Sequence, residues 1–180
     1  MVLLESLNLP LGSDAHDFNL PGIDGEDHSL ENYKGAKALV VIFMCNHCPY
    51  VQAVIERLII LQKKFPETEF VGINSNDSDG YPEDGFDKMK EYAEDWGLNF
   101  DYLRDETQEV AKIYKAQCTP DIYVFDKDQK LAYHGRIDDN WQHEDKATTQ
   151  ELHDALEALM KGENPSDQQY PSMGCSIKWK

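Results

Sequence analysis

The sequence has little of three things: long apolar runs, positive charge and cysteine. No apolar stretch approaches the roughly 20 residues that a membrane-spanning helix needs, and the longest, residues 38–45 (ALVVIFMC), has the length of a strand. The first ten residues, MVLLESLNLP, contain no basic residue, and Glu5 interrupts their apolar character. We therefore expect neither a membrane helix nor a secretory signal, and we expect a cytoplasmic location.

Positive charge is scarce, because 17 Lys and Arg residues stand against 34 Asp and Glu residues, which gives a net charge of −17. Nucleic acids and anionic membrane surfaces would repel such a chain, so we expect neither as a partner. The acidic residues are concentrated between residues 74 and 109, a segment that we interpret as a solvated face. Residues 32–65 contain one acidic residue, Glu56.

The cysteines are too few for a disulfide scaffold in a chain of 180 residues; they are Cys45, Cys48, Cys118 and Cys175. Cytoplasmic thiols are mostly reduced at rest. The Cys45-x-x-Cys48 spacing therefore indicates redox or metal chemistry rather than a structural cross-link.

Strand patterns alternate with helix patterns along the chain. Residues 38–44 are a continuous apolar run typical of a buried parallel strand, and residues 69–74 (EFVGIN) are predicted to form a second buried strand. Residues 49–65 between them have apolar residues at helical spacing. The remaining predicted elements are hairpins at 18–30 and 121–136, helices at 85–96, 106–115 and 148–161, and a short strand at 100–104.

This order of elements predicts an α/β protein with three α/β/α layers, a mostly parallel central sheet, an N-terminal β-hairpin and a helix-containing insertion. The length suits one domain. We predict that the domain covers residues 1–163 and that residues 164–180 form a C-terminal tail packing on it.

Cys45 and Cys48 are predicted to lie where a buried strand ends and a helix begins. A helix start carries unsatisfied N–H groups and about half a positive charge, which stabilise a thiolate. A thiol in such a place can have a pKa well below its ordinary value of about 8.5. We expect Cys45 to be the exposed, low-pKa attacking thiol and Cys48 to resolve the mixed disulfide.

Two neighbours of the pair also carry predictions. We expect His47 to donate a hydrogen bond to the Cys45 thiolate, the alternative being a histidine that faces solvent. Pro49 lacks an N–H group, which is harmless only in a first helical turn, and so places the helix start at or just before Cys48.

The segment Cys118-Thr119-Pro120 precedes a predicted strand, where either a cis or an ordinary trans proline bond fits the sequence. Extended backbone there would pair with a strand of a partner, which makes Thr119 and Pro120 candidate substrate-binding residues. Cys118 and Cys175 are possible auxiliary thiols, and for Cys175 an inert packed cysteine is the alternative.

Several of these segments resemble one family when taken together. They are the first hairpin, ALVVIFMCNHC with the following helix, EFVGIN, RDETQEVAKIY and QCTPDIYVFDKDQKLAYHGRIDD. They are similar to the redoxin branch of the thioredoxin-like superfamily, which includes the alkyl hydroperoxide reductase/thiol-specific antioxidant group, over residues 11–139. CNHCPYV and GCSIKW resemble a group of small bacterial thioredoxin-like proteins. The resemblance implies a thioredoxin fold, Cys45 and Cys48 as the redox pair and Pro120 as a cis-proline.

The sequence also departs from the family pattern. Thioredoxin has a buried acid on the strand before the pair, whereas ALVVIFM has none, so proton transfer from Cys48 must use water, His47 or a residue from elsewhere. Peroxiredoxins have a Thr three residues before the peroxidatic cysteine, and Cys45 takes that place before Cys48.

The favoured function is a thiol–disulfide oxidoreductase that acts on protein or small-molecule disulfides and thiols, with a separate electron donor or acceptor. We expect no cofactor and no bound metal. One alternative is a peroxiredoxin-like thiol peroxidase. The other is a metal-binding module in which Cu(I) or Zn²⁺ is ligated by Cys45, His47, Cys48 and Cys118.

Overall fold

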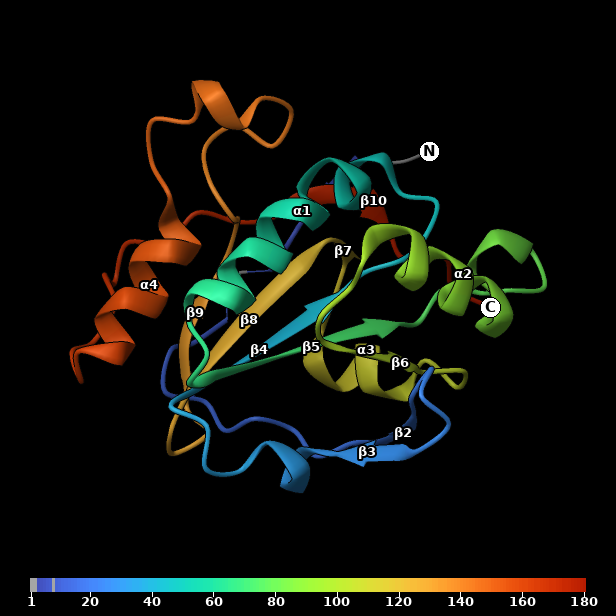
Figure 1. Cartoon of the computed structure of the whole chain (residues 1–180), viewed down its shortest axis with the longest axis horizontal. Coiled ribbons are helices and arrows are strands. Elements are labelled where there is room, and N and C mark those ends of the chain that lie inside the picture. Colours follow the sequence, from blue (N-terminus) through green and yellow to red (C-terminus); the bar gives the residue numbers. More distant parts are fainter. Residues whose placement is uncertain (1–2, 8) are drawn as a thin grey trace.

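The central strand β4 (Ala38–Phe43) consists of six consecutive buried residues, as expected for a strand covered on both faces. In the computed structural model it pairs in parallel with β5 (Thr68–Asn74) and antiparallel with β8 (Asp121–Asp126). The five-stranded sheet has the order β6-β5-β4-β8-β9, in which β8 alone runs against the other four strands (Figure 1). The predicted mostly parallel sheet is confirmed.

The structure describes residues 3–7 and 9–180, so residues 1, 2 and 8 of the predicted 1–163 domain lie outside the described residues. The other strands are β1 (Leu3–Glu5), β2 (Asn19–Pro21), β3 (Asp27–Ser29), β6 (Asp101–Arg104), β7 (Cys118–Thr119), β9 (Leu131–His134) and β10 (Met173–Ser176). The helices are α1 (Pro49–Lys64), α2 (Phe86–Trp96), α3 (Glu109–Tyr114) and α4 (Glu151–Met160), with short 3₁₀ turns at Leu30–Tyr33, Pro82–Asp84 and Glu144–Lys146.

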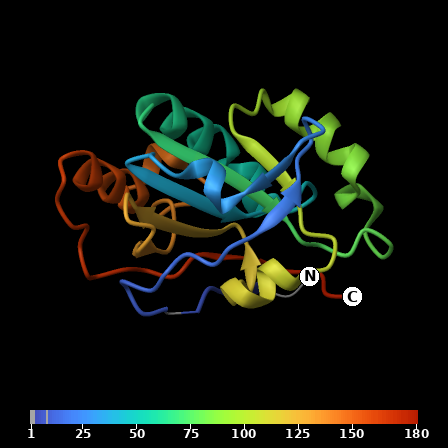
Figure 2. The ribbon, with the colours of Figure 1, turned by 90° about the horizontal axis from the view of Figure 1, so that it is seen from below.

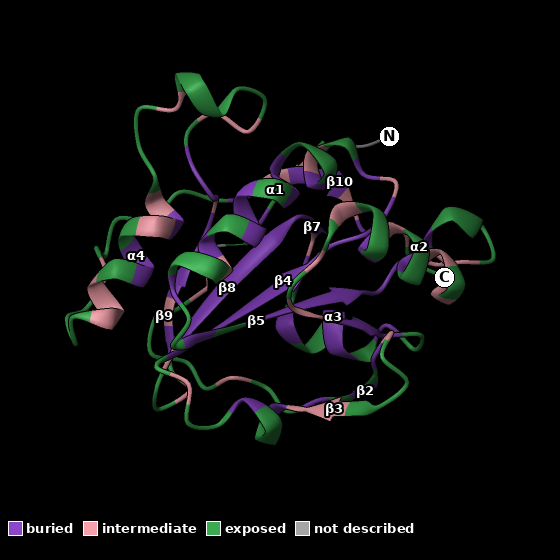
Figure 3. Cartoon of the chain, in the orientation of Figure 1, coloured by how far each residue is buried: buried purple, intermediate pink, exposed green. Residues whose placement is uncertain are grey.

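Each face of the sheet packs against its own set of elements. Alternate residues of β4, among them Val40 and Ile42, form one core with α1, α2 and α4. Leu39, Val41 and Phe43 point the other way and form a second core with α3 and the β2–β3 hairpin. Figure 2 shows α3 on one side of the sheet and the other helices on the opposite side, and Figure 3 shows the buried sheet between them. The three predicted layers are therefore present.

Helix α1 begins where the sequence analysis placed it. Cys48 is the N-cap residue, Pro49 occupies the first helical position, and the helix ends before Pro66. Its buried face packs on the sheet, while Lys63 and Lys64 in the last turn complement the negative end of the helix dipole. None of the helices among the described residues is both long enough and apolar enough to cross a membrane.

The C-terminal segment forms a strand that the sequence analysis did not predict. Strand β10 lies between β1 and β7 in an antiparallel three-stranded sheet, with Cys175 opposite Thr119 and Ser176 opposite Cys118. Gly174 permits this approach, because a Cβ atom there would lie 2.0 Å from the Thr119 carbonyl oxygen and 3.2 Å from the Pro120 nitrogen. A side chain at this position would collide with the backbone rather than with a movable group.

We expect Gly174→Ala to lower the free energy of unfolding by about 1–3 kcal/mol, because the new methyl group forces β10 away from β7. Urea titration followed by circular dichroism measures this change. Gly80→Ala is the matched control, since its Cβ would meet only the side chain of Asp77. Equal midpoints for Gly174→Ala and wild type would mean that β10 tolerates displacement at no cost.

Candidate active site

The two cysteines lie at the junction between β4 and α1, and both are buried. Cys45 is 1% exposed and Cys48 is fully buried. The prediction that Cys45 is the exposed thiol is therefore wrong. Thr119 packs against the Cys45 sulfur, and the segment that carries Asp84 packs against the following residue, so this turn is covered from two sides.

Three of the four cysteines, all reduced thiols, meet around the Thr119 backbone. Cys48 Sγ lies 2.8 Å from Cys175 Sγ and 3.1 Å from the Thr119 carbonyl oxygen, which accepts a hydrogen bond from the Cys48 thiol. Cys45 Sγ lies 3.5 Å from Thr119 Oγ1. The Thr119–Pro120 peptide bond is cis.

The pKa values of the pair are ordered opposite to the prediction. The hydrogen bond with Cys45, followed by the one with Cys175, lowers the pKa of Cys48 against the effect of burial. The same hydrogen bond, burial and the charge of Asp84 raise the pKa of Cys45. Position acts in the same direction, because Cys48 is the N-cap residue at the positive end of α1, whereas Cys45 lies three residues earlier and near a carboxylate.

That carboxylate, Asp84, is the residue that the sequence analysis missed. Asp84 was grouped with the solvated acidic segment, yet it is fully buried beneath the Cys45–Cys48 turn. Its Oδ1 accepts hydrogen bonds from the backbone N–H groups of Asn46 at 2.9 Å and of His47 at 3.4 Å, and its Oδ2 accepts one from Asn76 at 2.6 Å. Burial opposes its ionisation, but the contacts with His47 and Asn76 hold the pKa of Asp84 below its ordinary value.

His47 also lies differently from the prediction. Its Nδ1 contacts Asp84 Oδ2 at 2.7 Å, and its ring stacks on Tyr81 with ring centroids 5.5 Å apart. No hydrogen bond joins His47 to Cys45 among the described residues, so the expected donation to the Cys45 thiolate is wrong in this arrangement. The contact with Asp84 raises the pKa of His47, against the effect of burial.

Thr119 and Pro120 lie beside the thiols, but the predicted edge for a partner strand is occupied. Strand β10 of the same chain pairs with β7 where a substrate strand would add. The edge of β7 that the main-chain groups of Thr119 face is therefore paired with the chain's own C-terminal strand, and Thr119 and Pro120 as substrate-binding residues stay a prediction.

Cys118 stays apart from the other three thiols. Its Sγ lies 3.7 Å from the Pro120 carbonyl oxygen and 3.9 Å from that of Ser172, and burial raises its pKa. The metal set Cys45, His47, Cys48 and Cys118 is consequently not assembled. At the cysteine pair, the described residues instead bring together Cys45, His47 and Asp84, whose potential ligand atoms lie within 4.8 Å of one another; Asp24, His28 and Asp101 form a second such group elsewhere.

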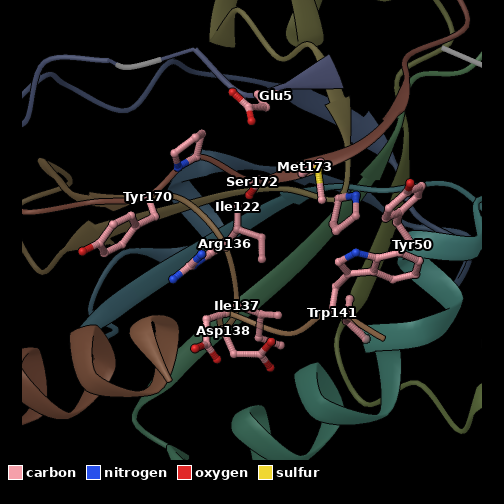
Figure 4. Close-up of a pocket in the computed structure, with 14 residues that line it drawn as sticks. Glu5, Tyr50, Ile122, Arg136, Ile137, Asp138, Trp141, Tyr170, Ser172 and Met173 are labelled. Atoms are coloured by element: carbon pink, nitrogen blue, oxygen red, sulfur yellow. The ribbon is translucent and has the colours of Figure 1, made fainter. Parts of the chain in front are cut away.

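A cavity of about 230 Å³ opens on the other side of Pro120. Figure 4 shows Tyr50 and Trp141 at one end and Tyr170 at the other, with Met173 of β10 between them. Tyr50 and Trp141 pack with ring centroids 4.2 Å apart. The cavity is bordered by the start of α1 and by β10, and it lies next to the thiols without being lined by them.

Solved structures share the fold of this chain. A solved structure of an uncharacterized conserved protein from Geobacillus kaustophilus is 46% identical and covers 100% of this chain and 97% of that one, with a TM-score of 0.95. The thioredoxin domain of a thiol-disulfide oxidoreductase from Bacteroides vulgatus is 19% identical and shares the fold, with a TM-score of 0.61 over 71% of this chain and 89% of that one. The predicted thioredoxin-like fold is confirmed.

Sequence relatives identify the chemistry. The thiol-disulfide oxidoreductase ResA of Geobacillus thermodenitrificans is 27% identical over 130 residues, which are 71% of this chain and 70% of the relative. The model of the AhpC/TSA family matches residues 11–134. The predicted class, a thiol-redox oxidoreductase with thiol and disulfide substrates, is thereby confirmed. The chain belongs to the AhpC/TSA family.

Proposed function

We propose that the chain exchanges electrons with disulfide substrates through Cys45 and Cys48. The observation that carries the proposal is the hydrogen bond that Cys48 shares with Cys45, which lowers the pKa of Cys48. Cys48 is also the N-cap residue of α1 and contacts Thr119 beside Pro120. A thiolate with a second thiol in contact is the minimum that thiol–disulfide exchange requires.

The reaction follows from this arrangement. The thiolate of the pair attacks one sulfur of the substrate disulfide, forms a mixed disulfide and releases one substrate thiolate, which takes up a proton. The second cysteine then attacks the protein sulfur of the mixed disulfide, which closes the Cys45–Cys48 bond and releases the second substrate thiol. Two electrons pass from the dithiol to the substrate, and the reverse sequence oxidises a substrate dithiol.

The closed β7 edge favours disulfides that reach the thiols without adding a strand, such as small-molecule disulfides or an exposed protein disulfide at a loop. The cavity beside Pro120 offers room for a neighbouring substrate group. We also propose a separate electron donor or acceptor and a cytoplasmic location. We propose no nucleic acid or membrane partner, because the net charge of −17 would repel both.

The test is oxidation of the fully reduced chain by oxidised glutathione, followed by alkylation of remaining thiols and mass analysis. We expect a Cys45–Cys48 disulfide to form in wild type and in the control Cys118→Ser. Cys45→Ser and Cys48→Ser should no longer form this bond. Retention of both thiols in wild type would refute the assignment.

Two further measurements on the reduced chain distinguish the rival functions from thiol–disulfide exchange. Rapid loss of hydrogen peroxide with no reaction toward oxidised glutathione would favour the thiol peroxidase. The cluster of Cys45, His47 and Asp84 supports the metal-binding alternative. Copper or zinc retained after gel filtration in chelator-free buffer, and lost in Cys45→Ser, would favour that function.

The position of the thiolate gives a second prediction. We expect the alkylation rate of Cys48 to rise with pH at a midpoint below the ordinary thiol value of about 8.5, and that of Cys45 to rise only at higher pH. Cys45→Ala should shift the Cys48 midpoint upward, because it removes the hydrogen bond that stabilises the thiolate. Cys118→Ala is the control. An unchanged midpoint in Cys45→Ala would show that the helix start alone sets the pKa of Cys48.

The His47–Asp84 contact predicts a pH-dependent stability. The raised pKa of His47 gives stability that is complete below about pH 6.5 and is lost as the pH rises through the folded value. The lowered pKa of Asp84 gives stability that is complete above about pH 3.9 and is lost as the pH falls through its folded value.

His47→Gln should therefore cost more unfolding free energy at about pH 5.5 than at about pH 9, as measured by urea titration. His143→Gln, at an exposed histidine, is the control. The pairing of His47 with Asp84 would be contradicted by an equal cost at the two pH values.

A further inference from the structure

Cys175 lies within the active site although it is 127 positions from Cys48 in the chain. It is buried, and its Sγ lies 2.8 Å from that of Cys48. The two residues come from unrelated elements, the C-terminal strand β10 and the N-cap of α1. A packed cysteine with no chemical role does not require the sulfur of a second cysteine as its neighbour.

The backbone of β10 determines where this thiol points. Cys175 is directly opposite Thr119 in the antiparallel ladder, and side chains of opposite residues project to the same face. Thr119 Oγ1 faces Cys45, so Cys175 projects toward the same group of thiols. Cys118 belongs to the adjacent pair of the ladder, and its sulfur faces the carbonyl groups of Pro120 and Ser172 instead.

Beyond β10, hydrogen bonds fix the last residues of the chain. The Lys178 N–H donates to Asn76 Oδ1 at 2.9 Å, and the Lys178 carbonyl oxygen accepts bonds from the Asp77 N–H and from Gln108. Asn76 in turn donates to Asp84 beneath the Cys45–Cys48 turn. The same polar network therefore positions the turn and the strand that carries Cys175.

We propose that Cys175 is a third redox thiol of this site and that Cys48 forms a disulfide with either Cys45 or Cys175. This inference rests on the proposed function, because disulfide exchange with a substrate first forms the Cys45–Cys48 disulfide. From that state the Cys175 sulfur attacks Cys48 Sγ, the Cys48–Cys175 bond forms and the Cys45–Cys48 bond breaks. Cys45 leaves as the thiolate and takes up the proton that Cys175 releases, so the step needs no further oxidant.

The electrostatics of the site are compatible with this step. In the reduced chain, burial, the hydrogen bond with Cys48 and the negative charge of Cys48 raise the pKa of Cys175 to about 12. In the Cys45–Cys48 disulfide, Cys48 carries no charge, so its charge no longer opposes the ionisation of Cys175. The ammonium group of Lys178 acts in the same favourable direction.

The new bond would join the C-terminal strand to the start of α1 and leave Cys45 as a thiol in an oxidised chain. The strand that closes the β7 edge would then be held covalently, whereas in the reduced chain only backbone pairing and side-chain contacts hold it. Cys45 would be available for a mixed disulfide while Cys48 is occupied.

Two double variants of the full chain test the proposal. Cys45→Ser/Cys118→Ser retains Cys48 and Cys175, and the matched control Cys45→Ser/Cys175→Ser retains Cys48 and Cys118. Each is treated with diamide while folded, then unfolded and alkylated with N-ethylmaleimide, and its mass is measured. Circular dichroism verifies that both variants are folded, and the same oxidation in urea shows whether bond formation depends on the fold.

We expect the first variant to lose both alkylation sites, faster when folded than in urea, and the control to keep both. In wild type, peptide mapping after oxidation should find Cys48 linked to Cys45 and to Cys175. If the folded first variant keeps both thiols while wild type forms Cys45–Cys48, the inference fails and the proposed function stands. If the first variant closes its bond but Cys45 never pairs in wild type, Cys48–Cys175 stands and the proposed Cys45–Cys48 exchange fails.

Discussion

The carboxylate of Asp84 holds the active-site turn and the C-terminal segment in one network. A charge removed from water is costly unless hydrogen bonds and an opposite charge replace the solvent. Asp84 obtains these from the backbone of Asn46, the side chain of Asn76 and the ring of His47. Asn76 also accepts a bond from the backbone of Lys178. The demand of one buried charge for partners thus fixes both the turn that carries Cys45 and the chain end that follows β10.

Closure by β10 explains why the thiols are buried in a protein that must react with disulfides. Strand β7 has only two residues, and its free edge would otherwise expose main-chain N–H and C=O groups beside the reactive sulfurs. The chain's own β10 satisfies those groups and, through Gly174, comes close enough to the Thr119 backbone to exclude another strand. The edge of β7 that pairs with β10 is thus used for internal stability.

The sequence predicts the sheet, the helices and the place of the redox pair because each depends on a local signal. The apolar run of β4, the spacing of α1 and Pro49 at its first position all act within a few residues. The burial of Asp84 has no such signal, since its side-chain partners come from two separate segments, residues 46–47 and Asn76, and its neighbours include exposed acids. A hint exists in Asn74-Ser75-Asn76, because polar residues directly after a buried strand, themselves buried here, need a polar partner.

Strand β10 and the position of Cys175 could not be predicted from the sequence, because they too depend on partners far away in the chain. Met173–Ser176 is short and follows a polar segment, and a strand of four residues becomes stable only through the partners on either side, β1 and β7, which are far away in the chain. The exposure of Cys45 was mispredicted from the same cause, because the groups that cover it are non-local.

The division of charge between the two cysteines follows from this geometry rather than from their spacing. A Cys-x-x-Cys pair places both sulfurs near a helix start, which favours a thiolate at either position. Here Cys48 is the N-cap residue and its hydrogen bonds with Cys45 and Cys175 lower its pKa, whereas the charge of Asp84 raises the pKa of Cys45. The carboxylate of Asp84 raises the pKa of Cys45, and the helix dipole of α1 favours the thiolate of Cys48, so both effects place the lower pKa on Cys48. The lower pKa of the pair therefore belongs to Cys48, which shares hydrogen bonds with Cys45 and Cys175, and this places the nucleophile where two alternative disulfides meet.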